Sequence, residues 1–219
     1  MSSIFSHSTD SLTIKLNVAQ RILATHAEGP GLRYAIWVRG CSLRCPGCCN
    51  PHMFQAQSPK ANWMNINTII DDIKMSLQQN PNLEGVSILG GEPVEQPQGL
   101  FELCRAIHQQ LGLSVMVFSG YLYKEIIQNT KLKPFLEYCD ILVDGPFDKD
   151  LPEEKGARRK WIGSQNQNIH ILSKTYAQLE KNWPTTKNTV EIRMKNGEIT
   201  INGFPFKSFD FMKSHRKSR

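Results

Sequence analysis

Three cysteines, Cys41, Cys45 and Cys48, have the type and the spacing to bind a metal centre. Their C-x3-C-x2-C pattern lets one short loop wrap three thiolates around a single iron–sulfur cubane. Three ligands leave one iron open, and an open position can bind a substrate directly, as in catalytic zinc sites. The alternatives are a zinc site or buried structural thiols. Structural zinc usually needs a second C-x2-C hook or histidines, and the sequence has no second hook, so we expect one [4Fe-4S] cluster.

The rest of the sequence predicts that these thiols lie in a reducing compartment. The first ten residues are rich in serine and have no apolar core, so they do not predict a signal peptide. No apolar run approaches the roughly 20 residues that span a bilayer, and we expect a cytoplasmic protein with no membrane partner. Six cysteines in that compartment are not expected to form disulfides. Cys104 lies on an apolar helical face and is expected in the core, while Cys139 is isolated.

Short apolar runs alternate with helical patterns along most of the chain. Each apolar run reads as a buried strand, and each is followed by a glycine or serine loop. This order predicts βαβ units and a parallel sheet, with the loops meeting at one rim, where α/β proteins bind ligands. The expected strands cover residues 34–38, 86–89, 114–118 and 141–143, and the expected helices cover residues 67–79, 100–111 and 122–128.

The pattern changes after residue 173. Alternating apolar and polar residues flank Asn196–Gly197, which predicts a β-hairpin from Val190 to Phe206. We therefore expect a core domain at residues 12–172, an extension with the hairpin at 173–206, and a basic, disordered tail at 207–219. The net charge of +6 is attributed mostly to that tail, so no nucleic-acid partner is expected.

Five motifs in register resemble one family. They are Gly29–Pro30–Gly31–Leu32–Arg33, the cysteine hook with Asn50, Gly90–Gly91–Glu92–Pro93, Ser119–Gly120–Tyr121 with Leu142–Val143–Asp144–Gly145, and Gly163–Ser164–Gln165–Asn166–Gln167. Together they resemble the radical S-adenosylmethionine superfamily, and within it the activating enzymes of glycyl-radical enzymes, above all those of anaerobic ribonucleotide reductases. The fold that this resemblance implies is a partial, open parallel βα barrel with the hairpin as an appendage.

The resemblance also implies a reaction. The open iron would chelate the amino and carboxylate groups of S-adenosylmethionine, and one electron would release a 5′-deoxyadenosyl radical that abstracts a hydrogen atom. No side chain is given a catalytic role beyond the cluster. The glycine pair would let the backbone approach the methionine group, whereas Ser119 and Asp144 either bond the cofactor or cap the next helix or turn. The expected cofactor-binding residues are Gly47, Cys48, Cys49, Gly90, Gly91, Glu92, Ser119 and Asp144.

Two departures from the family pattern leave questions open. An aromatic residue usually follows the third cysteine, but here it is Cys49, which is a spectator thiol, a packing surface for adenine or a rival ligand. The chain also continues past the asparagine–glutamine motif to residue 219, and the hairpin lies in this extension. The expected partners are a glycyl-radical enzyme and an electron donor of flavodoxin or ferredoxin type. An enzyme acting on a peptide or small molecule, and a non-catalytic iron–sulfur or zinc module, remain as alternatives.

Overall fold

The computed structural model describes residues 14–154, 158–195 and 198–203, and the proposed tail at 207–219 lies outside these ranges. A seven-stranded sheet forms the body, with strands in the order β3-β1-β2-β4-β5-β6-β7, and β8 and β9 form a separate two-stranded sheet. The strands are β1 (Lys15–Thr25), β2 (Leu32–Val38), β3 (Trp63–Asn65), β4 (Leu83–Gly90), β5 (Ser114–Phe118), β6 (Ile141–Asp144), β7 (Asn168–Ile171), β8 (Val190–Lys195) and β9 (Glu198–Gly203). The α-helices are α1 (Ile66–Gln79), α2 (Pro97–Ala106), α3 (Tyr123–Gln128) and α4 (Ala177–Lys181).

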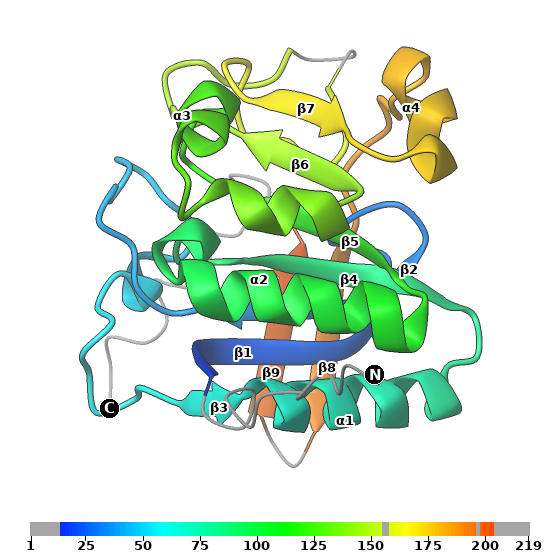
Figure 1. The fold of residues 1–219 in the computed structure, drawn as a ribbon. Coiled ribbons are helices and arrows are strands. Elements are labelled where there is room, and N and C mark those ends of the chain that lie inside the picture. Colours follow the sequence, from blue (N-terminus) through cyan, green and yellow to red (C-terminus); the bar gives the residue numbers. More distant parts are fainter. Residues whose placement is uncertain (1–13, 155–157, 196–197, 204–219) are drawn as a thin grey trace, which may run out of the picture.

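Four neighbouring strands, β2, β4, β5 and β6, run parallel, while β1, β3 and β7 pair antiparallel to their neighbours. The parallel strands follow one another across the sheet in chain order. Right-handed crossovers between strands in that order place the connecting helices on the same face. Figure 1 shows α1 and α2 in front of the sheet and the β8–β9 hairpin behind it. The predicted open, parallel α/β sheet and the C-terminal hairpin are therefore confirmed.

The main core lies between the sheet and its helices. Ile69, Ile70 and Ile73 of α1 and Leu100 and Leu103 of α2 are buried against the strands, as their helical spacing predicts. Cys104 is also fully buried in this core, which confirms its structural role. A smaller cluster contains Ile22 of β1, Ala35 and Trp37 of β2, and Met53 from the turn that follows the cysteines. In the described residues no helix is long and apolar enough to cross a membrane.

The hairpin presents its polar side to the body. Glu28, in the turn between β1 and β2, accepts hydrogen bonds from the Gly203 backbone (2.6 Å) and the Asn202 amide (3.2 Å). The Arg193 guanidinium donates to the Ala24 carbonyl at 2.7 Å. These contacts hold the C-terminal extension against the turn that precedes β2. The domain boundary expected at residue 173 stays a prediction.

Candidate functional site

The cysteine hook is the loop that leaves the carboxyl end of β2. Gly40, Arg44 and Gly47 have φ values of 105°, 48° and 77°, so the loop changes direction three times within eight residues. Glycine adopts this left-handed region without strain, whereas Arg44 does so at a cost. The turns leave Cys41, Cys45 and Cys48 half-buried and Cys49 exposed.

Neighbouring loops hold the hook in place. The Gly40 amide donates to the Met53 carbonyl at 2.8 Å and the Cys41 amide donates to Phe54 at 3.0 Å. The Ser42 amide and hydroxyl both donate to Glu95 Oε1, at 2.8 and 2.5 Å. Glu95 follows β4, so the hook is tied to the loop of the adjacent strand. Sequence reasoning missed Glu95, although it stands three residues after the expected Glu92.

The thiols differ in their surroundings. Burial raises the pKa of Cys41, while a hydrogen bond from Cys49 lowers the pKa of Cys48 to about 6. Cys49 as a whole residue is exposed, but its sulfur is enclosed, so the same hydrogen bond and then burial raise the pKa of Cys49. The Asn50 amide also donates to Cys48 Sγ at 3.4 Å.

This donor set fits an iron–sulfur cluster. Three half-exposed thiols lie in one loop, and the backbone amides of residues 43 and 44 point at Cys41. Among the described residues, no three His, Cys, Asp or Glu side chains lie close enough to hold a single metal ion. That result concerns one ion, for which sulfurs must come within about 4 Å of each other, whereas each cysteine of a cubane binds a different iron.

Gly90 and Gly91 bring the end of β4 against the start of the hook. The Gly91 amide donates to Val38 and the Glu92 amide to Gly40, both at 2.7 Å. A Cβ on Gly91 would lie 2.3 Å from the Gly40 carbonyl oxygen, which is closer than real contacts allow. The glycines therefore serve the packing of this chain's own backbone, in addition to any contact with a cofactor.

The Glu92 carboxylate joins the loops after β4 and β5. It accepts hydrogen bonds from the Ser119 hydroxyl (2.9 Å), the Gly120 amide (2.7 Å) and the Val94 amide (3.2 Å). Burial raises the pKa of Glu92 to about 7, although these three donors lower it. Two residues expected at the cofactor, Glu92 and Ser119, thus bond each other.

Asp144 ends β6 and has a capping role in the structure. Its carboxylate accepts from the Tyr123 amide at the start of α3 (2.5 Å) and from the Asn168 amide at the start of β7 (3.3 Å). His170 Nε2 lies 3.3 Å from the same carboxylate. Of the two roles that the sequence left open for Asp144, the geometry shows the cap.

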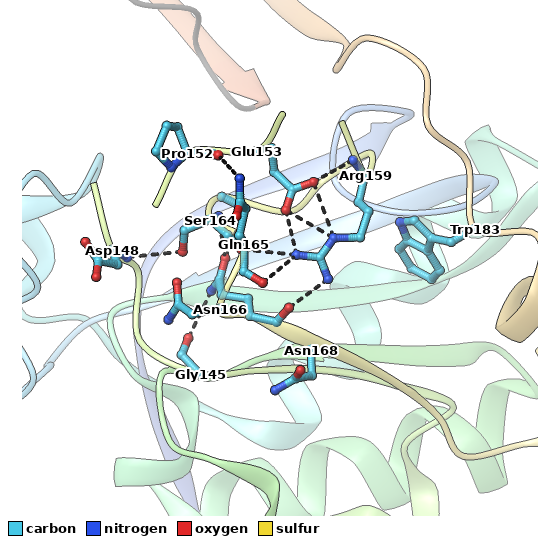
Figure 2. A network of polar contacts seen from close by, with 12 residues as sticks. Gly145, Asp148, Pro152, Glu153, Arg159, Ser164, Gln165, Asn166, Asn168 and Trp183 are labelled. Atoms are coloured by element: carbon cyan, nitrogen blue, oxygen red, sulfur yellow. Dashed lines mark hydrogen bonds and ion pairs between the residues drawn. The ribbon is translucent and has the colours of Figure 1, made fainter. Parts of the chain in front are cut away.

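A polar clamp, made of Arg159, Glu153 and residues 164–167, supports the loop after β6. Figure 2 shows the Arg159 guanidinium beside the Glu153 carboxylate. The guanidinium also donates to the backbone carbonyls of Ser164, Gln165 and Gln167, at 3.2, 3.1 and 2.8 Å. Glu153 Oε1 lies 2.5 Å from Arg159. Sequence reasoning gave Arg159 no role, because its partners are brought together only by folding.

The clamp reaches the cysteine hook through the loop at residues 145–149. The Gln167 amide donates to the Gly145 carbonyl (3.0 Å), the Asn166 amide to Pro146 (2.7 Å), and the Asp148 amide to the Ser164 hydroxyl (3.1 Å). A Cβ on Gly47 would lie 3.3 Å from the Lys149 side chain, so this loop lies against the hook. The asparagine–glutamine motif thus positions a loop beside the third cysteine.

Several known proteins are similar to this chain. The family described as "4Fe-4S single cluster domain" matches residues 27–170. The anaerobic ribonucleoside-triphosphate reductase-activating protein of Salmonella typhimurium is 33% identical over 153 residues, which are 66% of this chain and 92% of the relative. The proteins of that name from Escherichia coli K12 and phage T4 are 30% and 28% identical, and 92% and 85% of their lengths are covered. The solved structure of QueE from Escherichia coli is 19% identical to this chain, with a TM-score of 0.41. The match covers 52% of this chain and 57% of the QueE chain.

Proposed function

Because this chain belongs to the family of anaerobic ribonucleoside-triphosphate reductase-activating proteins, we propose that it is a radical S-adenosylmethionine activase that installs a glycyl radical on a partner reductase. When bound, the [4Fe-4S] cluster supplies one electron that splits S-adenosylmethionine into methionine and a 5′-deoxyadenosyl radical, which takes a hydrogen atom from a glycine Cα. The observation that carries the proposal is the hook itself, with three half-exposed thiols in one loop at the carboxyl edge of the parallel strands.

Within this proposal Cys41, Cys45 and Cys48 hold the cluster and leave one iron for the cofactor. Cys49 stays a spectator in this proposal, because two adjacent cysteines rarely reach one cubane together. All six cysteines are free, which suits a reducing compartment, and we place the protein in the cytoplasm on that basis.

The expected cofactor residues then divide by role. Gly90 and Gly91 offer backbone carbonyls at the rim, and Gly47 and Cys49 flank the third cysteine where adenine would lie. The Glu92 and Asp144 carboxylates hold the loops that carry these groups, because their oxygens already accept backbone and hydroxyl hydrogens. Ser119 helps to hold the same loops, because its hydroxyl donates to the Glu92 carboxylate. The chain thus supplies orientation and exclusion of water, as proteins generally do for reactive cofactors.

The carboxyl edge of the parallel strands is where we place the partner. Helices α1 and α2 cover one face of the sheet and the β8–β9 hairpin lies behind it, so a flexible glycine loop must reach the rim from its edge (Figure 1). Hydrogen abstraction requires the two carbons to lie about 3 to 3.5 Å apart. The electron would come from a donor of flavodoxin or ferredoxin type.

Two measurements on anaerobically reconstituted protein test the proposal. Cys48→Ala is expected to lose the cluster absorbance and Cys49→Ala to retain it, and the reverse result would contradict the ligand assignment. The wild-type protein, reduced and mixed with S-adenosylmethionine and a co-encoded reductase, is expected to give deoxyadenosine and the electron paramagnetic resonance doublet of a glycyl radical. If deoxyadenosine forms only with a peptide or small molecule, and no partner gains a radical, the enzyme acts on that other substrate class.

A further inference from the structure

A cavity of about 440 Å³ lies beside the cysteine hook. Its walls come from the end of β2, the hook, and the segment between Pro51 and Lys60. Arg39, Arg44, His52 and Lys60 line it, and no Asp or Glu does. The cavity is therefore basic, and it adjoins the loop that carries the cluster ligands without containing a cysteine.

Arg39 makes this cavity unlike an ordinary basic surface. The residue is only 6% exposed. One terminal nitrogen donates to the His52 carbonyl at 2.9 Å, but the buried Nε has no hydrogen-bond partner in the described part of the chain. No carboxylate of those residues forms an ion pair with Arg39. A buried cation without a counter-charge is costly, so such a group is normally matched by an anion.

Two further cations face the same space. Arg44 stands in the hook with φ of 48°, a conformation that costs energy for a residue with a side chain. Lys60 also lines the cavity and is exposed. Neither forms an ion pair with a carboxylate of the described residues. Three uncompensated positive charges from three separate segments thus converge on one hollow.

We propose that this cavity binds a phosphate oxyanion, carried by a nucleotide or free in solution. Arginine forks match phosphate oxygens in pairs, and several cations suit a group with more than one negative charge. The volume lies within the range of small-molecule sites, about 300 to 1,000 Å³. The Phe54 ring and the two prolines of the wall, Pro51 and Pro59, offer apolar surface to a base or sugar. An occupant would lie next to the loop that carries the cluster ligands.

The test is anaerobic titration calorimetry on the full chain with its cluster. Guanosine triphosphate is the nucleotide probe, because its base differs from that of S-adenosylmethionine, and inorganic phosphate is the second probe. We expect the nucleotide to bind, and Lys60→Met to weaken binding about tenfold, the value of one charge-assisted hydrogen bond. Arg39→Met should weaken it further. The matched control is Lys74→Met on α1, which removes the same charge far from the cavity and should leave affinity unchanged.

The titrations distinguish free phosphate from a nucleotide, and they distinguish a specific site in this cavity from general attraction to a basic protein. Equal affinity for phosphate and nucleotide identifies free phosphate as the ligand, and tighter nucleotide binding identifies the nucleotide. The proposal is overturned if neither probe binds at millimolar concentration, or if Lys74→Met weakens binding as much as Lys60→Met. It is also overturned if S-adenosylmethionine displaces the nucleotide one for one, since the cavity would then belong to the cofactor. Because Lys60 is exposed, its variant keeps the test valid even if Arg39→Met does not fold.

Discussion

Replacing Arg159 by methionine tests whether the clamp positions the loop beside the cysteine hook. Methionine keeps much of the side-chain volume but removes the guanidinium that bonds Glu153 and three backbone carbonyls. The Glu153 side chain is 5% exposed, so its carboxylate would stay buried with only the residue 159 backbone amide as partner (2.7 Å). Removing one member of a buried pair costs about 3 to 5 kcal/mol.

The lower end of that range applies here. The Arg159 side chain is 28% exposed, so solvent screens part of its charge, and the backbone amide donor remains. A loss of about 3 kcal/mol corresponds to roughly a hundredfold change in a local opening equilibrium. The loss should appear in the segments that the clamp joins, because those segments contribute few atoms to the main core.

Hydrogen exchange of individual amides measures this opening. The Asp148 amide bonds the Ser164 hydroxyl and the Gln165 amide bonds the Leu151 carbonyl, so both should exchange about a hundredfold faster in Arg159→Met. Affinity for S-adenosylmethionine should fall while cluster content is retained. Arg105→Met is the matched control, since it breaks a surface pair with Glu102 that is worth at most about 1 kcal/mol.

A second substitution tests how much of the loss comes from the unpaired charge of Glu153 and how much from the lost Arg159 hydrogen bonds. Glu153→Gln in the Arg159→Met background removes the unpaired buried carboxylate and should restore part of the protection. If Arg159→Met leaves exchange at Asp148 and Gln165 unchanged, the clamp does not hold the loop. If exchange rises but cofactor affinity matches that of Arg105→Met, the clamp is structural only.

Two other predictions concern the hairpin and the glycine pair. Burial raises the pKa of Glu28 from 4.5 to about 7, so the native state binds its proton more tightly than the unfolded chain. Stability should therefore fall by about 3 kcal/mol as pH rises from 4.5 through 7, and Glu28→Gln should flatten that fall in urea unfolding series. Gly91→Ala should shift the hook, because its Cβ would meet the Gly40 carbonyl at 2.3 Å, and should lower cluster yield on reconstitution. A normal yield would show that the hook adapts.

The parallel strands could be predicted because they are buried on both faces. Strands β2, β4, β5 and β6 appear in the sequence as short apolar runs, and the expected ranges lie within the observed ones. Strand β1 was missed, since two register irregularities break the alternation of its side chains. Strand β7 was missed because its four residues, Asn168–Ile171, lie at the sheet edge and mix polar with apolar types.

The site was predictable as a set of loops but not as a set of contacts. Motif spacing placed Glu92, Ser119 and Asp144 at strand ends, and the structure puts them there. Most partners of the two carboxylates are backbone amides, such as Gly120 for Glu92 and Tyr123 for Asp144. Backbone amides carry no residue-type signal, so sequence alone cannot assign those bonds. The same limit hid the partners of Arg159.

These contacts imply that the rim is built before any cofactor arrives. Glu95 ties the hook to the loop after β4, Glu92 ties that loop to the one after β5, and Asp144 ties the loop after β6 to α3. Each carboxylate uses its oxygens on groups of the chain itself, so none needs a ligand to be satisfied. A site assembled in this way loses little conformational entropy on binding. The cluster then has to order only the hook, where the thiols remain half-exposed and the chain bends at Gly40, Arg44 and Gly47.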